Sequence, residues 1–210
     1  NINLVTGTHF APSLAEAVDS ARSRGLSLPI VWNTSGFETP RTLELLDSRV
    51  DVYLTDLKTL SRQTAEARMG RADYPDCIRA ALPRMLQNRA LAFRGEALVR
   101  GVIVRHLVLP DAIAESLEVI RWFGSEVGGG ALFSLMTQFI DPEAGSAGGC
   151  VSGAEYNQLL EALDAAGIEE GFVQEPEEES IWLPDFTRSN PFPADYSHPV
   201  WHWREGFVSR

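Results

Sequence analysis

Polar and charged side chains directly follow apolar runs at five places in the sequence. They are Thr6, Thr8 and His9; Asn33, Thr34 and Ser35; Asp56 and Lys58; Arg105 and His106; and Thr137 and Gln138. Together these groups can bind a polar small molecule, because they offer hydrogen-bond donors, acceptors and charges of both signs. Threonine, serine and asparagine also cap helices and make turns, so each residue taken alone has a structural interpretation as well.

Lys58 is the only lysine in a chain that otherwise uses arginine, at 17 positions, for its basic side chains. A compact amine kept at one position can contact an anionic ligand, or can form a Schiff base as in an aldolase. Asp56, two residues earlier, argues against the Schiff base, because a neighbouring carboxylate favours the charged form of a lysine.

Arg105 lies within an apolar run, between Val104 and Leu107, so its guanidinium is expected to point into a sheet interior or a barrel mouth. A buried guanidinium needs a partner, because an isolated buried charge is costly. Two interpretations stay open: a structural salt bridge to Asp56, and a clamp on a ligand carboxylate or phosphate.

The residues that commonly bind metals are few. His9 and His106 could form a two-histidine site, but their spacing gives it no support. Cys77 and Cys150 are the only cysteines, too few for a disulfide framework or a four-cysteine metal site, so a reducing, cytoplasmic location is expected.

The elements that must position these side chains alternate along the chain. Helix signals, among them Ser13 with Glu16 and Ser152 with Glu155 as capping boxes and Thr39-Pro40 as a helix start, separate the apolar runs. Pro75 and Pro83 are expected to start or break helices between residues 61 and 89. The apolar runs predict five strands and a sixth candidate: Ile2–Val5, Leu28–Trp32, Val50–Leu54, Gly101–Leu109, Ala131–Phe139 and Ile168–Gln174.

This alternation predicts an α/β protein with a parallel sheet, either doubly wound or a barrel. In such folds, ligands meet the carboxyl ends of the strands, which is where the polar residues above lie. The glycine-rich motifs of dinucleotide-binding and P-loop proteins are absent from the sequence.

The charge of the chain bears on its partners. With 29 acidic and 18 basic residues the formal net charge is −11, which argues against nucleic acid or an anionic membrane as a partner. No apolar run is long enough to predict a transmembrane helix, and the first residues do not resemble a signal peptide.

Five segments occur here in the order of one radical S-adenosylmethionine group: NINLVTGTH, LPIVWNTSGFE, VDVYLTDLK, RGVIVRHLVLP and SLMTQF. The chain resembles the pyruvate-formate-lyase-activating-enzyme-like proteins from Asn1 to about Phe186, leaving residues 187–210 as a Pro- and Trp-rich tail. The resemblance implies a parallel-stranded partial (β/α)6 TIM-like barrel that lacks its first strand–helix unit.

The resemblance also implies a set of cofactor-binding residues. Thr6 to His9 correspond to the strand end that meets the methionine amino group, with Thr-Gly-Thr in place of the usual Gly-Gly-Glu. Asn33, Thr34 and Asp56 correspond to residues that hold a monovalent cation beside the cofactor, although Asn33 replaces a charged residue. The full set implied to bind S-adenosylmethionine is Thr6, His9, Asn33, Thr34, Asp56, Lys58, Arg105 and Gln138.

The Cys-x-x-x-Cys-x-x-Cys segment that holds the [4Fe-4S] cluster in this group has no counterpart here. We therefore expect a C-terminal portion of a radical enzyme, inactive alone, whose full-length form uses an external electron donor and acts on an unknown substrate, possibly a protein. A non-catalytic barrel that binds a ligand is the main alternative, and an aldolase-type barrel using Lys58 is the third.

Overall fold

A computed structural model describes residues 1–87, 89–109, 111–139, 151–176, 201–202 and 206–207. The described chain divides into two compact units, of which the first contains residues 1–139 and 151–176. In the second unit the described residues form a small antiparallel hairpin, β8 (Trp201–His202) and β9 (Gly206–Phe207). The predicted boundary at residue 186 lies outside the described residues.

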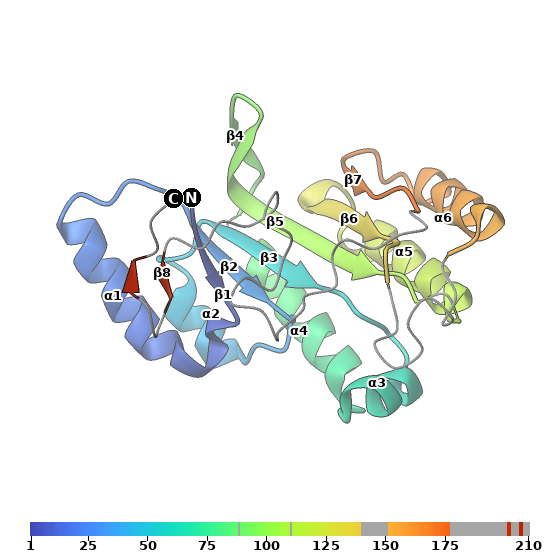
Figure 1. The fold of residues 1–210 in the computed structure, drawn as a ribbon, viewed down its shortest axis with the longest axis horizontal. Coiled ribbons are helices and arrows are strands. Elements are labelled where there is room, and N and C mark those ends of the chain that lie inside the picture. Colours follow the sequence, from blue (N-terminus) through green and yellow to red (C-terminus); the bar gives the residue numbers. More distant parts are fainter. Residues whose placement is uncertain (88, 110, 140–150, 177–200, 203–205, 208–210) are drawn as a thin grey trace. The chain divides into compact units, whose positions relative to one another are not determined.

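The first unit is built on a seven-stranded sheet (Figure 1). Its strands are β1 (Ile2–Val5), β2 (Ile30–Thr34), β3 (Val52–Asp56), β4 (Ala92–Arg94), β5 (Ala97–Leu107), β6 (Leu132–Met136) and β7 (Gly171–Val173). The order is β1-β2-β3-β5-β6-β7, and all these neighbours are parallel, whereas β4 pairs antiparallel with β5 as a hairpin. The predicted α/β fold with a parallel sheet is therefore confirmed.

Each parallel strand lies beside the next parallel strand along the chain, without the reversal of order that marks a doubly wound sheet. Right-handed crossovers in such an order place the connecting helices on one face of the sheet. Among the described residues, β1 and β7 pair on one side only, so the sheet is open, as in a partial barrel.

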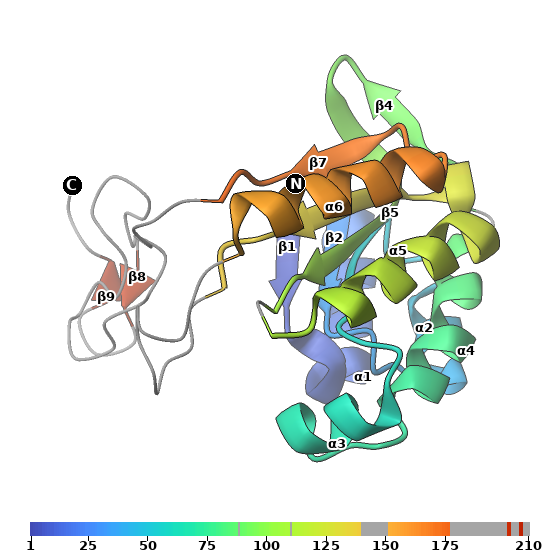
Figure 2. The ribbon, with the colours of Figure 1, turned by 90° about the vertical axis from the view of Figure 1, so that its right-hand side faces the viewer.

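The helices connect successive strands and pack on one another. They are α1 (Ala11–Ser23), α2 (Pro40–Leu46), α3 (Arg62–Met69), α4 (Tyr74–Leu86), α5 (Ile113–Glu126) and α6 (Gly153–Ala165), with 3-10 turns at Gly7–Phe10 and Gly128–Gly130. Contacts join α1 to α2, α2 to α4, and α5 to α6, and Figure 2 shows the last pair side by side. None of these helices is both long and apolar enough to span a membrane.

Alternate strand positions divide the two faces of the sheet. Trp32, Tyr53, Val104 and Phe133 lie in the core cluster with the helices. The intervening positions of β2, β3 and β5 place Asn33, Asp56 and Arg105 on the opposite face. The core thus fixes which strand residues are available for binding.

Three local predictions were wrong. Helix α1 begins at Ala11, because the 3-10 turn Gly7–Phe10 runs directly into it, so Ser13 is not its cap. Pro83 does not break α4, since the fully buried Leu82 and Met85 hold that part of the helix against the core. The fourth predicted strand starts earlier, at Ala97, because it forms a hairpin with β4.

Candidate functional site

The carboxyl ends of β1, β2, β3 and β5 surround a pocket of about 540 Å³. Parallel strands in sequential order end at one edge of a sheet, so residues up to 100 positions apart meet there. The pocket is lined by Val5, Thr6, Thr8, His9, Asn33, Thr34, Ser35, Phe37, Asp56, Lys58 and Arg105. Seven of the eight residues predicted to bind a cofactor are in this set.

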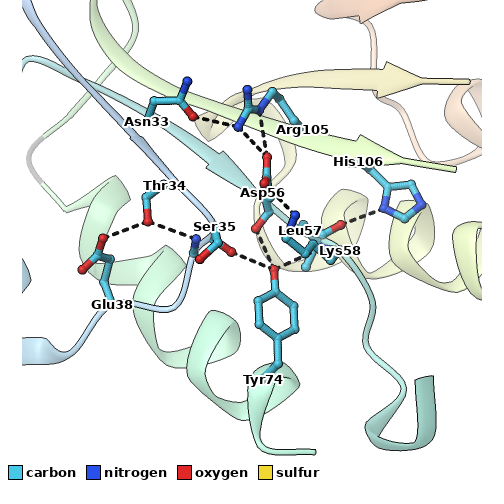
Figure 3. A network of polar contacts seen from close by, with 11 residues as sticks. Asn33, Thr34, Ser35, Glu38, Asp56, Leu57, Lys58, Tyr74, Arg105 and His106 are labelled. Carbon is cyan, nitrogen blue, oxygen red and sulfur yellow. Dashed lines mark hydrogen bonds and ion pairs between the residues drawn. The ribbon is translucent and has the colours of Figure 1, made fainter. Parts of the chain in front are cut away.

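Asp56 joins the two basic side chains of the pocket (Figure 3). Its Oδ1 accepts from Arg105 Nε at 2.8 Å, and its Oδ2 accepts from Lys58 Nζ at 2.9 Å. Asp56 and Arg105 are register partners on β3 and β5, which explains why their side chains meet. Arg105 Nη2 also donates to Asn33 Oδ1 at 2.8 Å, so three strands are tied together at the pocket.

The salt bridge between Arg105 and Asp56, one of the two interpretations left open by the sequence, is present. The Lys58 side chain is 42% exposed and ion-paired, unlike the desolvated amine that a Schiff-base enzyme uses. No observation at this site therefore favours the aldolase alternative.

Tyr74 and His106 contact the backbone of the segment that carries Lys58. The Tyr74 hydroxyl accepts from the Lys58 backbone N–H at 3.1 Å and lies 2.9 Å from the Asp56 carbonyl oxygen and 3.0 Å from that of Ser35. Burial raises the pKa of Tyr74, so its hydroxyl keeps the proton that it donates to these carbonyls. The loops after β2 and β3 are thus fixed to one phenol.

His106 points to the helix side of β5, away from Arg105 (Figure 3). Its Nδ1 lies 2.7 Å from the Leu57 carbonyl oxygen and therefore carries the proton, so its Nε2 accepts from Ser116 Oγ at 2.9 Å. Burial lowers the pKa of His106 to about 4, and the ring is neutral near pH 7. His9, by contrast, is exposed in the pocket wall.

Gly36 allows the loop after β2 to pass close to β3. Its φ is +82°, and an added Cβ would clash with Ile78 Cδ1 and would lie 2.7 Å from the Asp56 carbonyl oxygen. A side chain at this position would separate the two strand ends that carry Asn33 and Asp56.

Gln138 is the one predicted residue that does not line the pocket. Its side-chain amide nitrogen donates to the Glu175 carbonyl oxygen at 3.2 Å, while its Oε1 is buried without a hydrogen-bond partner. Thr137, next to it, donates to the Gln174 carbonyl oxygen at 2.9 Å. Both residues tie the end of β6 to the segment after β7.

Glu38 is a residue of the site that the sequence analysis did not single out. It is 4% exposed, and its Oε1 accepts from Thr8 Oγ1 at 2.7 Å, from Trp32 Nε1 at 2.9 Å and from Thr34 Oγ1 at 2.8 Å. Its position four residues after the strand end gave no signal, because the donors come from two different strand ends.

The described residues offer few ligands for a metal ion or a cluster. The described residues contain no group of three or more His, Cys, Asp or Glu side chains arranged to hold a metal. Cys77 is half-buried on α4, outside the pocket lining, and Cys150 lies outside the described residues. The two cysteines of this chain do not fit a [4Fe-4S] cluster, which needs several thiolates.

The side-chain oxygens predicted to bind a monovalent cation already take part in hydrogen bonds with neighbouring residues. The oxygens of Asn33 and Asp56 accept from Arg105 and Lys58, and Thr34 Oγ1 is bonded to Glu38 and to the Gly36 N–H. Two basic side chains beside these oxygens disfavour a further cation.

A second pocket, of about 730 Å³, lies near the β4–β5 hairpin, at the other ends of the strands. Its lining is mostly apolar, and Arg89, one of its two basic residues, is bonded to Asp47 Oδ1 at 2.9 Å. The smaller pocket at the carboxyl ends is lined by more polar and charged side chains, so we take it as the candidate site.

Comparison with known proteins supports the fold of this chain. No model of a known protein family matches the sequence. An uncharacterized protein of Methanocaldococcus jannaschii is 29% identical over 141 residues, which are 66% of this chain and 37% of that protein. The matched part of the chain thus spans little more than a third of the length of this curated relative.

Among solved structures, a domain of pyruvate-formate lyase-activating enzyme from Bacteroides vulgatus superposes with a TM-score of 0.61. The match covers 83% of this chain and 98% of that domain, at 10% sequence identity. At this low sequence identity, the comparison shows a shared fold alone.

Proposed function

We propose that the pocket binds S-adenosylmethionine and that this chain is part of a radical S-adenosylmethionine enzyme of the activating-enzyme type. The observation that carries the proposal is the meeting of Thr8, Asn33, Asp56, Lys58 and Arg105 in one pocket. The fold shared with a domain of pyruvate-formate lyase-activating enzyme supports it. The cluster would be held by residues outside this chain, and an external electron donor and the substrate would meet the longer protein.

The residues of the pocket fit the groups of this cofactor. Lys58 and Arg105 keep further N–H donors beyond those given to Asp56 and Asn33, and these would hold the cofactor carboxylate. Phe37 and Val5 offer apolar contact for a nucleoside at the same pocket. Thr6, His9 and Thr34 complete the proposed binding set, whereas Gln138 would act only through the segment after β7.

The chemistry that S-adenosylmethionine supplies in such enzymes is a 5′-deoxyadenosyl radical, which abstracts a hydrogen atom from the substrate. The residues of this chain bind and orient. Asp56 fixes Lys58 and Arg105 in place, and Tyr74 and His106 hold the loop that carries Lys58.

Substitution of Lys58 tests the proposal. Lys58→Ala should weaken S-adenosylmethionine binding by about 10- to 100-fold, because a charge-assisted contact is lost. Lys58→Arg should restore part of the affinity, since a planar guanidinium does not replace a compact ammonium. Binding is measured by titration calorimetry on this chain and on the longer protein that contains it.

Arg68→Ala is the matched control, since it also removes one exposed basic side chain from an ion pair, with Asp111. Equal affinities for the wild type and Lys58→Ala would contradict the role of Lys58. A non-catalytic binding module is the second candidate, because this chain has only two cysteines. Binding of S-adenosylmethionine by a longer protein with no three-cysteine motif would favour that candidate.

A further inference from the structure

Glu115 is a half-buried carboxylate in the first turn of α5 that contacts a segment outside its own helix. Its Oε2 accepts from Thr59 Oγ1 at 2.7 Å, and its Oε1 accepts from Thr64 Oγ1. A carboxylate in the first turn of a helix interacts favourably with the helix dipole whatever its side chain contacts. The two threonine contacts are therefore not required by α5 itself.

Thr59 directly follows Lys58 in the sequence and is 4% exposed. Its Oγ1 donates to Glu115 and accepts from the Ser61 N–H at 3.0 Å, so one hydroxyl joins the segment after β3 to α5. Residues 57–61 lie between β3 and α3 and have no regular secondary structure. Because no ladder of backbone hydrogen bonds holds them, contacts of this kind determine the path of the backbone there.

Leu57, on the other side of Lys58, is tied to the same turn of α5. Its carbonyl oxygen lies 2.7 Å from His106 Nδ1 (Figure 3), and His106 Nε2 accepts from Ser116 Oγ at 2.9 Å. Ser116 is the residue after Glu115. Both neighbours of Lys58 are thus connected to the first turn of α5, one directly and the other through an imidazole.

The ion pair between Lys58 and Asp56 does not by itself fix this segment. The Lys58 side chain is 42% exposed, and ion pairs of exposed lysines contribute little to stability. The lysine stem is flexible, so its ammonium stays beside Asp56 only where the backbone places it within reach. The Tyr74 hydroxyl gives the Lys58 N–H one point of attachment, and the contact of Thr59 with α5 gives the segment another.

We infer that Glu115 is a positioning residue of the pocket. By holding Thr59 against α5, it fixes the backbone that places the Lys58 ammonium beside Asp56. The anionic group that Lys58 would then bind, the carboxylate of S-adenosylmethionine, rests on the proposed function, whereas the placement of Lys58 does not.

The position of Lys58 can be followed directly. Because Lys58 is the only lysine, incorporation of carbon-13-labelled lysine gives one set of side-chain NMR signals, whose relaxation measures the order of that side chain. Asp56→Asn removes the ion pair and provides the value for a released Lys58. Glu115→Ala should lower the order of the Lys58 side chain most of the way to this value.

Glu115→Gln is the conservative variant, because its amide oxygen can accept from Thr59 and its amide N–H can donate to Thr64 Oγ1. It should keep the wild-type order of Lys58, as should Glu118→Ala, which removes an exposed carboxylate from the same helix. A Glu115→Ala variant that melts earlier but keeps the wild-type order of Lys58 would show a structural role alone and overturn the inference. Equal loss of order in Glu115→Gln and Glu115→Ala would also overturn it, since the charge would then act without the contact.

Thr59→Val decides the question if Glu115→Ala does not fold. It removes the hydroxyl that contacts Glu115 and keeps a side chain of similar size, so the order of Lys58 should fall as it does in Glu115→Ala. Wild-type order of Lys58 in Thr59→Val would overturn the inference.

Titration with S-adenosylmethionine separates this inference from the proposed function. Glu115→Ala should weaken binding by about 3- to 10-fold and should have no further effect in the Lys58→Ala background, because it acts through Lys58. An equal loss in the two backgrounds would overturn the inference. If the wild type does not bind S-adenosylmethionine, the proposed function fails, while the order of Lys58 still decides the role of Glu115.

Discussion

At the scale of single residues, the site depends on how each polar atom is already engaged. Asp56 divides its two oxygens between Arg105 and Lys58, and Asn33 takes a further donor of Arg105. These bonds fix the basic groups at the pocket before any ligand arrives. Because a preorganised charge loses less entropy on binding, Lys58 and Arg105 are suited to recognise an anionic group.

His106 gives a pH-dependent prediction at this scale. Its pKa is lowered by burial from 6.5 to about 4, so below pH 6.5 the unfolded chain binds a proton that the folded chain excludes. The free energy of unfolding attributable to His106 is therefore complete above pH 6.5 and falls as the pH drops toward 4. Between pH 7.5 and 5 the loss should be about 2 kcal/mol.

Urea denaturation at the two pH values measures this loss. His106→Asn keeps a donor for the Leu57 carbonyl without titrating, so its pH dependence should be smaller than that of the wild type by this amount. The exposed His9→Asn is the control for the loss of a histidine that is not buried. Equal slopes for His106→Asn and the wild type would disprove the assignment.

At the scale of elements, the loops after β2 and β3 determine the pocket. The Tyr74 hydroxyl contacts backbone atoms of both loops, and Gly36 brings them within van der Waals distance of each other. α4 therefore supports the site although none of its residues lines the pocket.

Gly36→Ala should destabilise the protein by about 1–3 kcal/mol, because its φ of +82° and its contact with the Asp56 carbonyl both exclude a Cβ. Gly153→Ala, in the first turn of α6 with no atom within 4 Å of its added Cβ, should be neutral or slightly stabilising. Thermal denaturation compares the two variants. A Gly36→Ala variant as stable as the wild type would mean that the two loops are not held this closely.

At the scale of the whole molecule, the sequential order of the parallel strands brings the pocket residues together. β1, β2, β3 and β5 are neighbours, and each contributes side chains to one pocket from its carboxyl end. The same order leaves β1 and β7 as edges among the described residues. The first unit carries this sheet in a chain whose fold resembles that of the activating-enzyme domain.

The cysteine content of the whole chain predicts the outcome of cluster reconstitution. With only Cys77 and Cys150, the chain should stay colourless in the visible range after anaerobic incubation with iron and sulfide. A variant with both cysteines replaced by serine should behave in the same way. A load of four irons per chain that depends on these cysteines would contradict the proposal that the cluster is held elsewhere.

The sequence alone determined the alternation of strands and helices and the meeting of most strand-end residues. Apolar runs and capping residues are local signals, and parallel topology then obliges the carboxyl ends to converge. For this reason Asn33, Asp56, Lys58 and Arg105 could be grouped before their geometry was known. Their binding role remains a prediction.

Only the tertiary structure decided which face each side chain takes and which partner it finds. Arg105 and His106 are adjacent, yet one enters the pocket and the other the helix side, because the register of β5 against β3 assigns alternate residues to opposite faces. Glu38 gave no sequence signal, since its donors are brought together by two strands and a turn. Local patterns carry no information about such long-range pairing, which depends on how the packed elements fit against one another.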